Sequence, residues 1–319
     1  NNTLKGYNTK VNFWRKKQMS EDKQPLEQAV PVEKEMTDQN KKINWFVMFK
    51  RCIGEILGTA VLVCIGCGAA TGLAMNGATL GEIAIATSLT FGLVVTALSY
   101  ALGEFTGCHV NPAVTFAMWL DGRIGWKQML LYTLSQVVGG IIGAALLVGF
   151  LGHNWDPSAL AAGADMGIIN TYASNAVSGT LISRFGTAGG YVIGLFAEIF
   201  FALVFVFTIL CTSHDKANKG LSGIALGLSL TSIVFFGFSI TGTGVNPARS
   251  LGTALMALVN GQTEPIKEIW IFIFGPYIGA GLATLCYWAV WHDHGPHHPN
   301  DKRNPTDKIK EKIDSKENK

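Results

Sequence analysis

The chain carries one short phrase twice, each time between long apolar runs. Residues 106–113 read TGCHVNPA and residues 241–248 read TGTGVNPA. Asn followed by Pro signals a helix start, because Asn caps exposed N–H groups and Pro suits the first helical position. We therefore predict short helices over 112–120 and about 247–258, both too short to cross the ~30 Å core of a bilayer. Two such half-helices, one in each half of a repeated chain, indicate a site near the membrane midplane.

The composition agrees with a membrane setting. Hydrophobic residues make up 49% of the 319, charged residues only 15%, and the mean hydropathy is +0.30, which is unusual for a soluble protein. The net charge of +3 does not indicate nucleic-acid binding, because the basic residues cluster in tails and short loops. The six cysteines show no spacing typical of disulfides or a zinc site. We expect no metal, no cofactor, no nucleic acid and no enzyme activity.

Six apolar segments are each long enough, at about 20 residues, to cross a bilayer as helices. They are Cys52–Met75, Ile83–Leu102, Gln128–Gly152, Gly189–Cys211, Gly220–Ile240 and Trp270–Trp291. Five of them carry two glycines four residues apart, a spacing that lets helices in lipid approach closely. The glycine pairs are Gly54/Gly58, Gly139/Gly143, Gly190/Gly194, Gly223/Gly227 and Gly275/Gly279.

Polar tails flank the apolar region. Residues 1–44 are rich in charge and lack an apolar core, so we expect a disordered tail and no cleavable signal peptide. We also expect Met19 to be the natural start, because the chain does not begin with Met. Residues 293–319 form a second polar tail, which leaves a channel domain over 45–292. A histidine cluster at its start favours a solvated segment, with metal binding as the alternative: His292, His294, His297 and His298.

The basic residues also predict orientation, since cytoplasmic loops collect Lys and Arg. Lys and Arg precede the first and third segments, lie between the fourth and fifth, and follow the sixth. Few lie in the other loops. We therefore expect a multi-pass protein of the cell membrane with both termini cytoplasmic.

The duplication extends beyond the repeated phrase. Glu55 opens the first half, about 47–152, as Glu198 opens the second, about 189–292. Three spanning segments per half is an odd number, so the halves must insert with opposite orientations. The expected fold is an all-α membrane protein with six transmembrane helices and two re-entrant half-helices in a 3+3 inverted repeat. The stretches 103–110 and 241–245 should be non-helical and present carbonyls to a solute path.

These features closely resemble the aquaporin, or major intrinsic protein, family over about residues 47–292. The resemblance rests on the six spans, the two intramembrane Glu residues, the Arg249 that follows the second Asn-Pro-Ala box, and the boxes themselves. Such a family member is a passive channel for water in a lipid bilayer, with a pore through each subunit of a homotetramer. The box residues are Asn111, Pro112, Ala113, Asn246, Pro247 and Ala248.

Matching the family pattern position by position implies a selectivity filter of Phe91, Val234, Thr243 and Arg249. We call these four the filter residues. Phe91 and Thr243 look like the water-selective type. Val234 departs from it, since water channels usually carry His there and glycerol facilitators Gly, and resembles an aliphatic variant of some prokaryotic members. We expect a water channel with a wider, more apolar filter that also passes small neutral solutes.

The residues also suggest how such a channel would exclude ions. Each half-helix has a partial positive charge at its N-terminus, so the centre should repel cations, protons included. Asn111 and Asn246 can donate N–H groups to a passing oxygen. A water held by both must point its hydrogens outward, which interrupts a proton wire. The resemblance further implies that His109 lines the cytoplasmic half of the pore, with pH gating as an alternative role.

Three alternatives to a water channel stay open, one of them a purely structural junction protein. A glycerol facilitator belongs to the same family. An ion-coupled secondary transporter also has inverted repeats and broken helices, and Glu55 with Glu198 would then form a proton-coupling pair. The resemblance favours another role for these two carboxylates, which is to support the re-entrant loops by accepting their N–H groups.

Overall fold

The computed structural model describes residues 44–153, 155–213 and 219–291. In this part of the chain six helices are long and apolar enough to cross a membrane. Nearly all of both predicted tails, and the histidine cluster, lie outside the described residues. The six spanning helices are α2 (Trp45–Met75), α3 (Leu80–Thr106), α5 (Trp126–Leu151), α7 (Gly179–Thr212), α8 (Lys219–Thr241) and α10 (Glu264–Val290).

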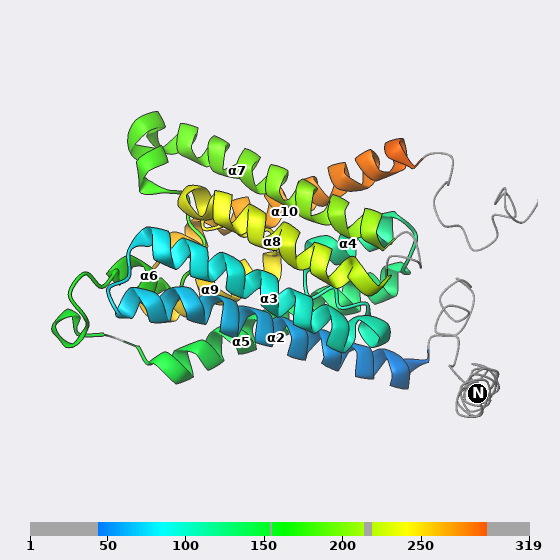
Figure 1. The fold of residues 1–319 in the computed structure, drawn as a ribbon, viewed down its shortest axis with the longest axis horizontal. Coiled ribbons are helices and arrows are strands. Elements are labelled where there is room, and N and C mark those ends of the chain that lie inside the picture. Colours follow the sequence, from blue (N-terminus) through cyan, green and yellow to red (C-terminus); the bar gives the residue numbers. More distant parts are fainter. Residues whose placement is uncertain (1–43, 154, 214–218, 292–319) are drawn as a thin grey trace, which may run out of the picture. The chain divides into compact units, whose positions relative to one another are not determined.

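Two short helices lie inside the bundle. The first, α4 (Pro112–Leu120), and the second, α9 (Pro247–Val259), begin at the proline of each repeated phrase, as predicted. A connecting segment between α5 and α7 holds a 3₁₀ turn, Pro157–Ala159, and a short helix, α6 (Met166–Thr171). Figure 1 shows α4 and α9 in opposite halves of the bundle, and the start of α2 and the end of α10 at the same end.

Most of the spanning helices are longer than the apolar segments that predicted them. Polar and aromatic residues extend their ends, for example at the start of α3, where Thr79 and Glu82 cap each other's backbone N–H groups. Such a capping box satisfies N–H groups that have no partner within the helix. The largest difference is in α7, which begins ten residues before the predicted Gly189. Gly186, at φ 72°, breaks the helix into two pieces.

The first predicted non-helical stretch is shorter than expected, and the second, predicted over 241–245, lies one residue later because α8 includes Thr241. Residues 103–106 were expected to lie outside a helix, but α3 continues to Thr106, and Gly107 ends it in the left-handed conformation with φ 91°. Glycine adopts this conformation without strain and is a common helix terminator. The prediction of carbonyls facing a solute path from 103 onwards is therefore wrong for 103–106. Only residues 107–111 and 242–246 connect a spanning helix to a half-helix.

Glycines allow the helices to pack closely, as predicted. A Cβ on Gly143 of α5 would lie 2.4 Å from the carbonyl oxygen of Ala60 in α2, and one on Gly279 of α10 would lie 2.3 Å from that of Ile199 in α7. Both distances are far below the ~3.5–4.0 Å of normal atomic contact. A glycine packed against a backbone carbonyl therefore lets α5 approach α2 in one half and α10 approach α7 in the other.

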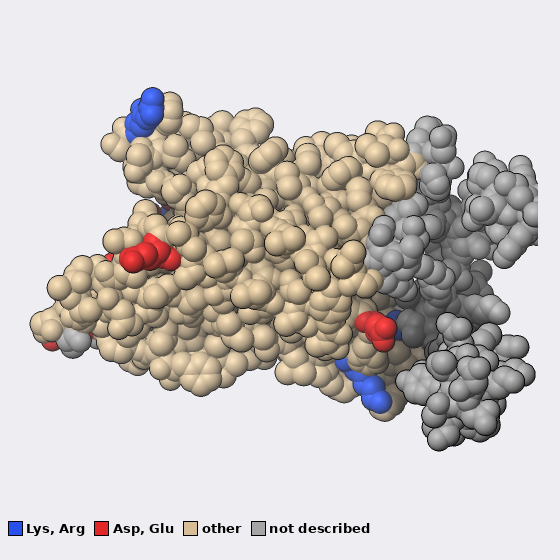
Figure 2. All heavy atoms as spheres, in the orientation of Figure 1, with Lys and Arg blue, Asp and Glu red and all other residues tan. Residues whose placement is uncertain are grey.

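The outer surface is suited to lipid. Many large apolar side chains point away from the core, and on the face shown in Figure 2 charged side chains appear only towards the two ends of the molecule. A band free of charge between charged ends is what a bilayer requires of a spanning protein. The predicted fold, six transmembrane helices with two re-entrant half-helices, is confirmed. The large apolar side chains exposed on the outer surface include Leu57, Leu93, Leu134, Phe150, Phe196 and Phe236.

Candidate functional site: a central pocket where two half-helices meet

The two boxes are built alike. The Oδ1 atom of Asn111 accepts the N–H of Ala113 at 2.9 Å, and Oδ1 of Asn246 accepts the N–H groups of Ala248 at 3.1 Å and Arg249 at 3.3 Å. Each asparagine thus caps its own half-helix. The N-termini of both half-helices, where the partial positive charge of a helix lies, are directed to the same place in the molecule.

Each asparagine also binds the loop of the other half. Nδ2 of Asn111 donates to the carbonyl oxygen of Val245 at 2.9 Å, and Nδ2 of Asn246 donates to that of Val110 at 2.8 Å. A side-chain amide carries two N–H bonds, so this exchange uses one N–H of each asparagine and leaves one for another acceptor. The halves are therefore joined at the centre by a reciprocal pair of hydrogen bonds.

The two connecting loops repeat in backbone conformation as well as in sequence. Cys108 and Val110 have φ of 49° and 42°, and Thr243 and Val245, at the matching positions, have φ of 50° and 47°. Non-glycine residues rarely adopt positive φ, and β-branched ones least of all. Strain of this kind costs on the order of 1–3 kcal/mol per residue and concentrates at functional sites. The surrounding structure must hold both loops in place.

Two buried carboxylates supply much of that hold. Glu55 accepts the N–H of His109 at 3.1 Å and that of Val110 at 2.7 Å. Glu198 accepts the N–H groups of Gly244 and Val245, both at 2.8 Å. Both carboxylates are fully buried.

Each carboxylate has one further donor, and here the halves differ. Gln136 of α5 donates to Glu55 at 2.7 Å, while the hydroxyl of Thr241 donates to Glu198 at 2.6 Å. A buried charge is tolerated when hydrogen bonds of this kind compensate it. Both carboxylates are therefore engaged by at least three donors.

The pocket itself lies between the loops and four spanning helices. It encloses about 30 Å³, room for very few waters at ~10–15 Å³ each and far below the ~300–1,000 Å³ of a typical small-molecule site. We call it the central pocket. It is lined by Leu62, Phe91, Val95, His109, Val110, Asn111, Phe205, Leu230, Val234, Thr243, Gly244, Val245, Asn246 and Arg249.

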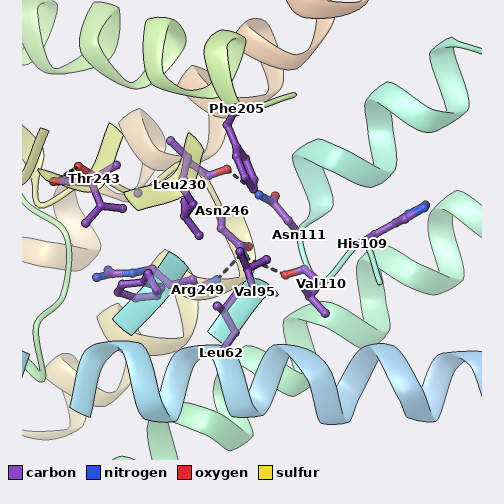
Figure 3. Close-up of a pocket in the computed structure, with 14 residues that line it drawn as sticks. Leu62, Val95, His109, Val110, Asn111, Phe205, Leu230, Thr243, Asn246 and Arg249 are labelled. Carbon is purple, nitrogen blue, oxygen red and sulfur yellow. Dashed lines mark hydrogen bonds between the residues drawn. The ribbon is translucent and has the colours of Figure 1, made fainter. Parts of the chain in front are cut away.

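The structure brings the predicted site residues together along this pocket. All four filter residues, both asparagines and His109 line it. Figure 3 shows Arg249 and Thr243 towards one end, Asn111 and Asn246 in the middle, and His109 at the other end. Pro112, Ala113, Pro247 and Ala248 form the first turns of α4 and α9 behind the asparagines.

Arg249 is held from several sides. Its Nη1 donates to Oδ1 of Asn175 and its Nη2 to the carbonyl oxygen of Ala173 at 3.0 Å, both in the segment before α7. Its guanidinium carbon lies 5.6 Å from the ring centre of Phe91. The side chain is buried, and within the described part of the molecule its Nε finds no acceptor. The guanidinium is thus fixed in the pocket wall by its two Nη atoms.

His109 is fixed by a chain of polar groups. Its Nδ1 lies 3.1 Å from the hydroxyl of Thr115, Gln136 donates to that hydroxyl at 2.8 Å, and Gln136 also binds Glu55. Its ring meets the ring of Tyr132 edge-on, with centres 5.3 Å apart. His109, Thr115 of the half-helix α4 and the carboxylate of Glu55 therefore belong to one hydrogen-bond network.

Several pocket residues were not singled out by sequence. Leu62, Val95, Phe205 and Leu230 line the pocket, but an apolar residue inside an apolar helix carries no sign of which way it faces. Asn175 was also missed. It is buried and binds Arg249, the hydroxyl of Ser250 at 2.8 Å and the carbonyl of Thr241 at 3.3 Å. A polar residue between apolar segments was its only signal.

Fold and site together define a class of protein: a multi-pass membrane channel built from an inverted repeat, with a narrow path between two half-helices. Residues 42–287 match the family model described as Major intrinsic protein. The chain belongs to the major intrinsic protein family, which confirms the resemblance seen in the sequence.

Individual sequence relatives belong to the same family. The chain is 34% identical over 235 residues to Aquaporin Z of Rhodopseudomonas palustris, covering 74% of this chain and 90% of that protein. It is 33% identical over 239 residues to Aquaporin Z of Bradyrhizobium diazoefficiens, covering 75% and 92%. Among solved structures, the aquaglyceroporin from Plasmodium falciparum shares the fold, with a TM-score of 0.60, 19% identity, and coverage of 75% of this chain and 95% of that one.

Proposed function

We propose that this protein is a passive channel that conducts water in single file, passes small neutral solutes more slowly, and excludes ions and protons. The observation that carries the proposal is the meeting of two half-helix N-termini, two asparagine donors and one buried arginine around a pocket of about 30 Å³. Membership of the major intrinsic protein family and the Aquaporin Z relatives support it.

Exclusion of cations follows from the charges around the pocket. The partial positive charges of α4 and α9 and the guanidinium of Arg249 all repel a cation entering a narrow, poorly hydrated path. The N–H left on each asparagine can bind the oxygen of the same passing water. That water then donates outward in both directions and accepts no proton from its neighbours, so the wire is broken at the asparagines.

The filter residues give the proposed selectivity. The four filter residues lie together at one end of the pocket, where the guanidinium of Arg249 can donate to a solute oxygen. Val234 adds an apolar wall and no donor. The second candidate function, a glycerol facilitator, is favoured by this one residue, because an aliphatic wall suits the carbon backbone of a polyol.

The proposed role of Glu55 and Glu198 is to hold the strained loops, with His109 lining the pocket at the end away from Arg249. The alternative, an ion-coupled transporter, needs at least one carboxylate that takes up and releases protons in contact with the solute path. Neither carboxylate lines the central pocket, and each accepts hydrogen bonds from two N–H groups of a connecting loop. This arrangement argues against proton coupling.

For topology we propose that both termini are cytoplasmic, that the protein resides in the cell membrane, and that residues 1–44 and 293–319 are tails outside the channel domain. The common end of α2 and α10 in Figure 1 supports termini on one side. A homotetramer is proposed from the family. Apolar side chains exposed on α2, α3, α7 and α8 offer surface for lipid or for neighbouring subunits.

Stopped-flow light scattering on proteoliposomes tests the function. The purified full chain should make vesicles shrink in an impermeant osmolyte much faster than protein-free vesicles, while an enclosed pH dye reports no added proton flux. Glycerol should enter more slowly than water leaves. Shrinkage no faster than bare lipid, or ready proton conduction, would overturn the proposal. Equal rates for glycerol and water would favour the facilitator, and flux that depends on a proton or sodium gradient would favour the transporter.

A further inference from the structure

The ring of Phe91 lies in a recess of helix α2. A Cβ atom placed on Gly66 would lie 2.4 Å from Cε1 of Phe91, 2.5 Å from Cζ and 2.7 Å from Cδ1. Carbon atoms in contact sit ~3.5–4.0 Å apart, so any side chain at position 66 would occupy the space of the ring. Gly66 is buried and has a helical conformation that any residue can adopt. The absence of a side chain, not backbone freedom, is therefore what the Phe91 ring requires at this position.

Away from Gly66, the ring borders Arg249 and the central pocket. The guanidinium carbon of Arg249 lies 5.6 Å from the centre of the ring, and Phe91 forms part of the wall of the central pocket. If the recess in α2 were filled, the ring would have to move by about 1 Å towards the contact distances of packed atoms. Such a move is directed away from α2, towards Arg249 and the pocket. In a pocket of about 30 Å³ this is a large change.

We infer that Gly66 is a positioning residue that sets the width of the filter by giving the Phe91 ring its place in α2. The inference rests on the proposed function, since it concerns which solutes pass the same site. Gly66 acts through the ring. A chain with a larger residue at position 66 has a narrower filter even when all four filter residues are kept.

The test compares two glycines of the same helix. Gly66→Ala should bring the ring into the pocket, lowering glycerol permeability by roughly ten-fold, the order of discrimination that one methyl group gives, and water permeability by less. Gly72→Ala is the control, because a Cβ there meets no atom within 4 Å. Its water and glycerol rates should equal those of the wild type. All variants are full-length chains in proteoliposomes, with protein density matched by quantitative blotting.

A second background separates positioning from general damage. In Phe91→Ala the ring is absent, so adding Gly66→Ala should leave the ratio of water to glycerol permeability unchanged. If Gly66→Ala alone fails to fold, the double variant should fold, because the overlap that prevents folding is gone. Failure of the double variant to fold, or an equal effect of Gly66→Ala in both backgrounds, would overturn the inference.

The outcomes also distinguish the inference from the function beneath it. A wild type that conducts water, together with a Gly66→Ala variant of unchanged solute ratio, would contradict the role of Gly66 alone. A wild type that conducts no more water than bare vesicles would contradict the proposed function and this inference with it.

Discussion

Arg249 donates a hydrogen bond to Asn175, a residue 74 positions earlier in the segment that precedes α7. The matching position of the first repeat is Val114, so one half-helix carries a charge at this point and the other does not. The inverted repeat is therefore nearly symmetric in its backbone and asymmetric in its charge. Only the end of the pocket near Arg249 can act as a charged filter.

Removing Asn175 should loosen that filter. In Asn175→Ala, Arg249 keeps the carbonyl of Ala173, but the hydroxyl of Ser250 and the carbonyl of Thr241 lose a partner. We expect a loss of about 2 kcal/mol in stability, typical of a hydrogen bond to a charged group, and a faster glycerol flux relative to water. Thermal unfolding in detergent and stopped-flow rates measure the two effects. The control is Asn76→Ala, at an exposed asparagine that donates only locally, to the carbonyl oxygen of Gly72 in α2; it should leave the flux ratio unchanged and lower stability by much less.

The two box asparagines should be equivalent. Asn111→Ala removes a helix cap and leaves the carbonyl of Val245 unpaired, and Asn246→Ala does the same to its own cap and to Val110. A lost cap costs about 1 kcal/mol and an unpaired buried carbonyl about 1–3 kcal/mol. Both variants should unfold at lower temperature by similar amounts and leak protons faster, as reported by an enclosed pH dye. A variant as proton-tight as the wild type would contradict the proposed break in the water wire.

Glu55 and Glu198 should matter for stability before they matter for flux. A glutamine offers one acceptor oxygen and turns its NH₂ group towards a donor, so Glu55→Gln and Glu198→Gln each lose at least one bond to a loop N–H. We expect each to lose about 1–3 kcal/mol of unfolding free energy. Thermal unfolding checks this, with the exposed Glu264→Gln unchanged as control. Stable variants whose flux alone had lost dependence on a proton gradient would instead support the transporter.

The charge pair at the far end of α4 should stabilise the bundle. Asp121 is buried, and its carboxylate binds Arg123 at 2.7 Å and the indole N–H of Trp288 in α10 at 2.7 Å. Asp121→Ala leaves the arginine without this partner and should cost about 3 kcal/mol, as for other broken buried pairs. Lys267→Ala breaks the exposed pair with Glu264 and should have no measurable effect. Equal unfolding temperatures for the two variants would contradict this account.

Val234 should determine how well the filter rejects glycerol. Val234→His adds bulk and a polar group to the pocket wall, so glycerol permeability should fall by roughly ten-fold while water flux falls less. Leu228→Val, on the exposed face of the same helix, should leave both rates unchanged. Parallel shrinkage curves in a non-permeant osmolyte and in glycerol give the ratio. A His variant that slows water more than glycerol would show that residue 234 does not set the filter width.

Local signals predicted the fold well because each was strong. Asn and Pro start both half-helices at the expected residue, and a long apolar run specifies a spanning helix whatever its partners. The start of α7 was missed because its first turns, residues 179–188, include Ser183 and Arg184 among the apolar residues and contain the kink at Gly186. Hydropathy alone does not register such a piece.

The site was only partly readable from sequence. The filter residues could be named by resemblance, since the family pattern counts positions from the boxes. Asn175 and Gly66 could not, because each acts through a residue far away in the chain, Arg249 and Phe91. Contacts of this kind depend on how helices cross, and no local pattern records them.

The half-helices also decide the order in which this protein can be assembled. The half-helix of the second repeat, α9, packs on α5 of the first, where Cβ atoms on Gly140 and Gly252 would each lie within 2.3 Å of the other helix's backbone, and α4 packs on α10, with the rings of Phe116 and Tyr277 5.3 Å apart. Each half therefore completes the other. During synthesis the first three spans enter the bilayer with a half-helix that lacks its contacts with α9 and α10 until those helices have been made. The pocket needs residues of both halves, so the ribosome must finish nearly the whole protein before the pore is complete.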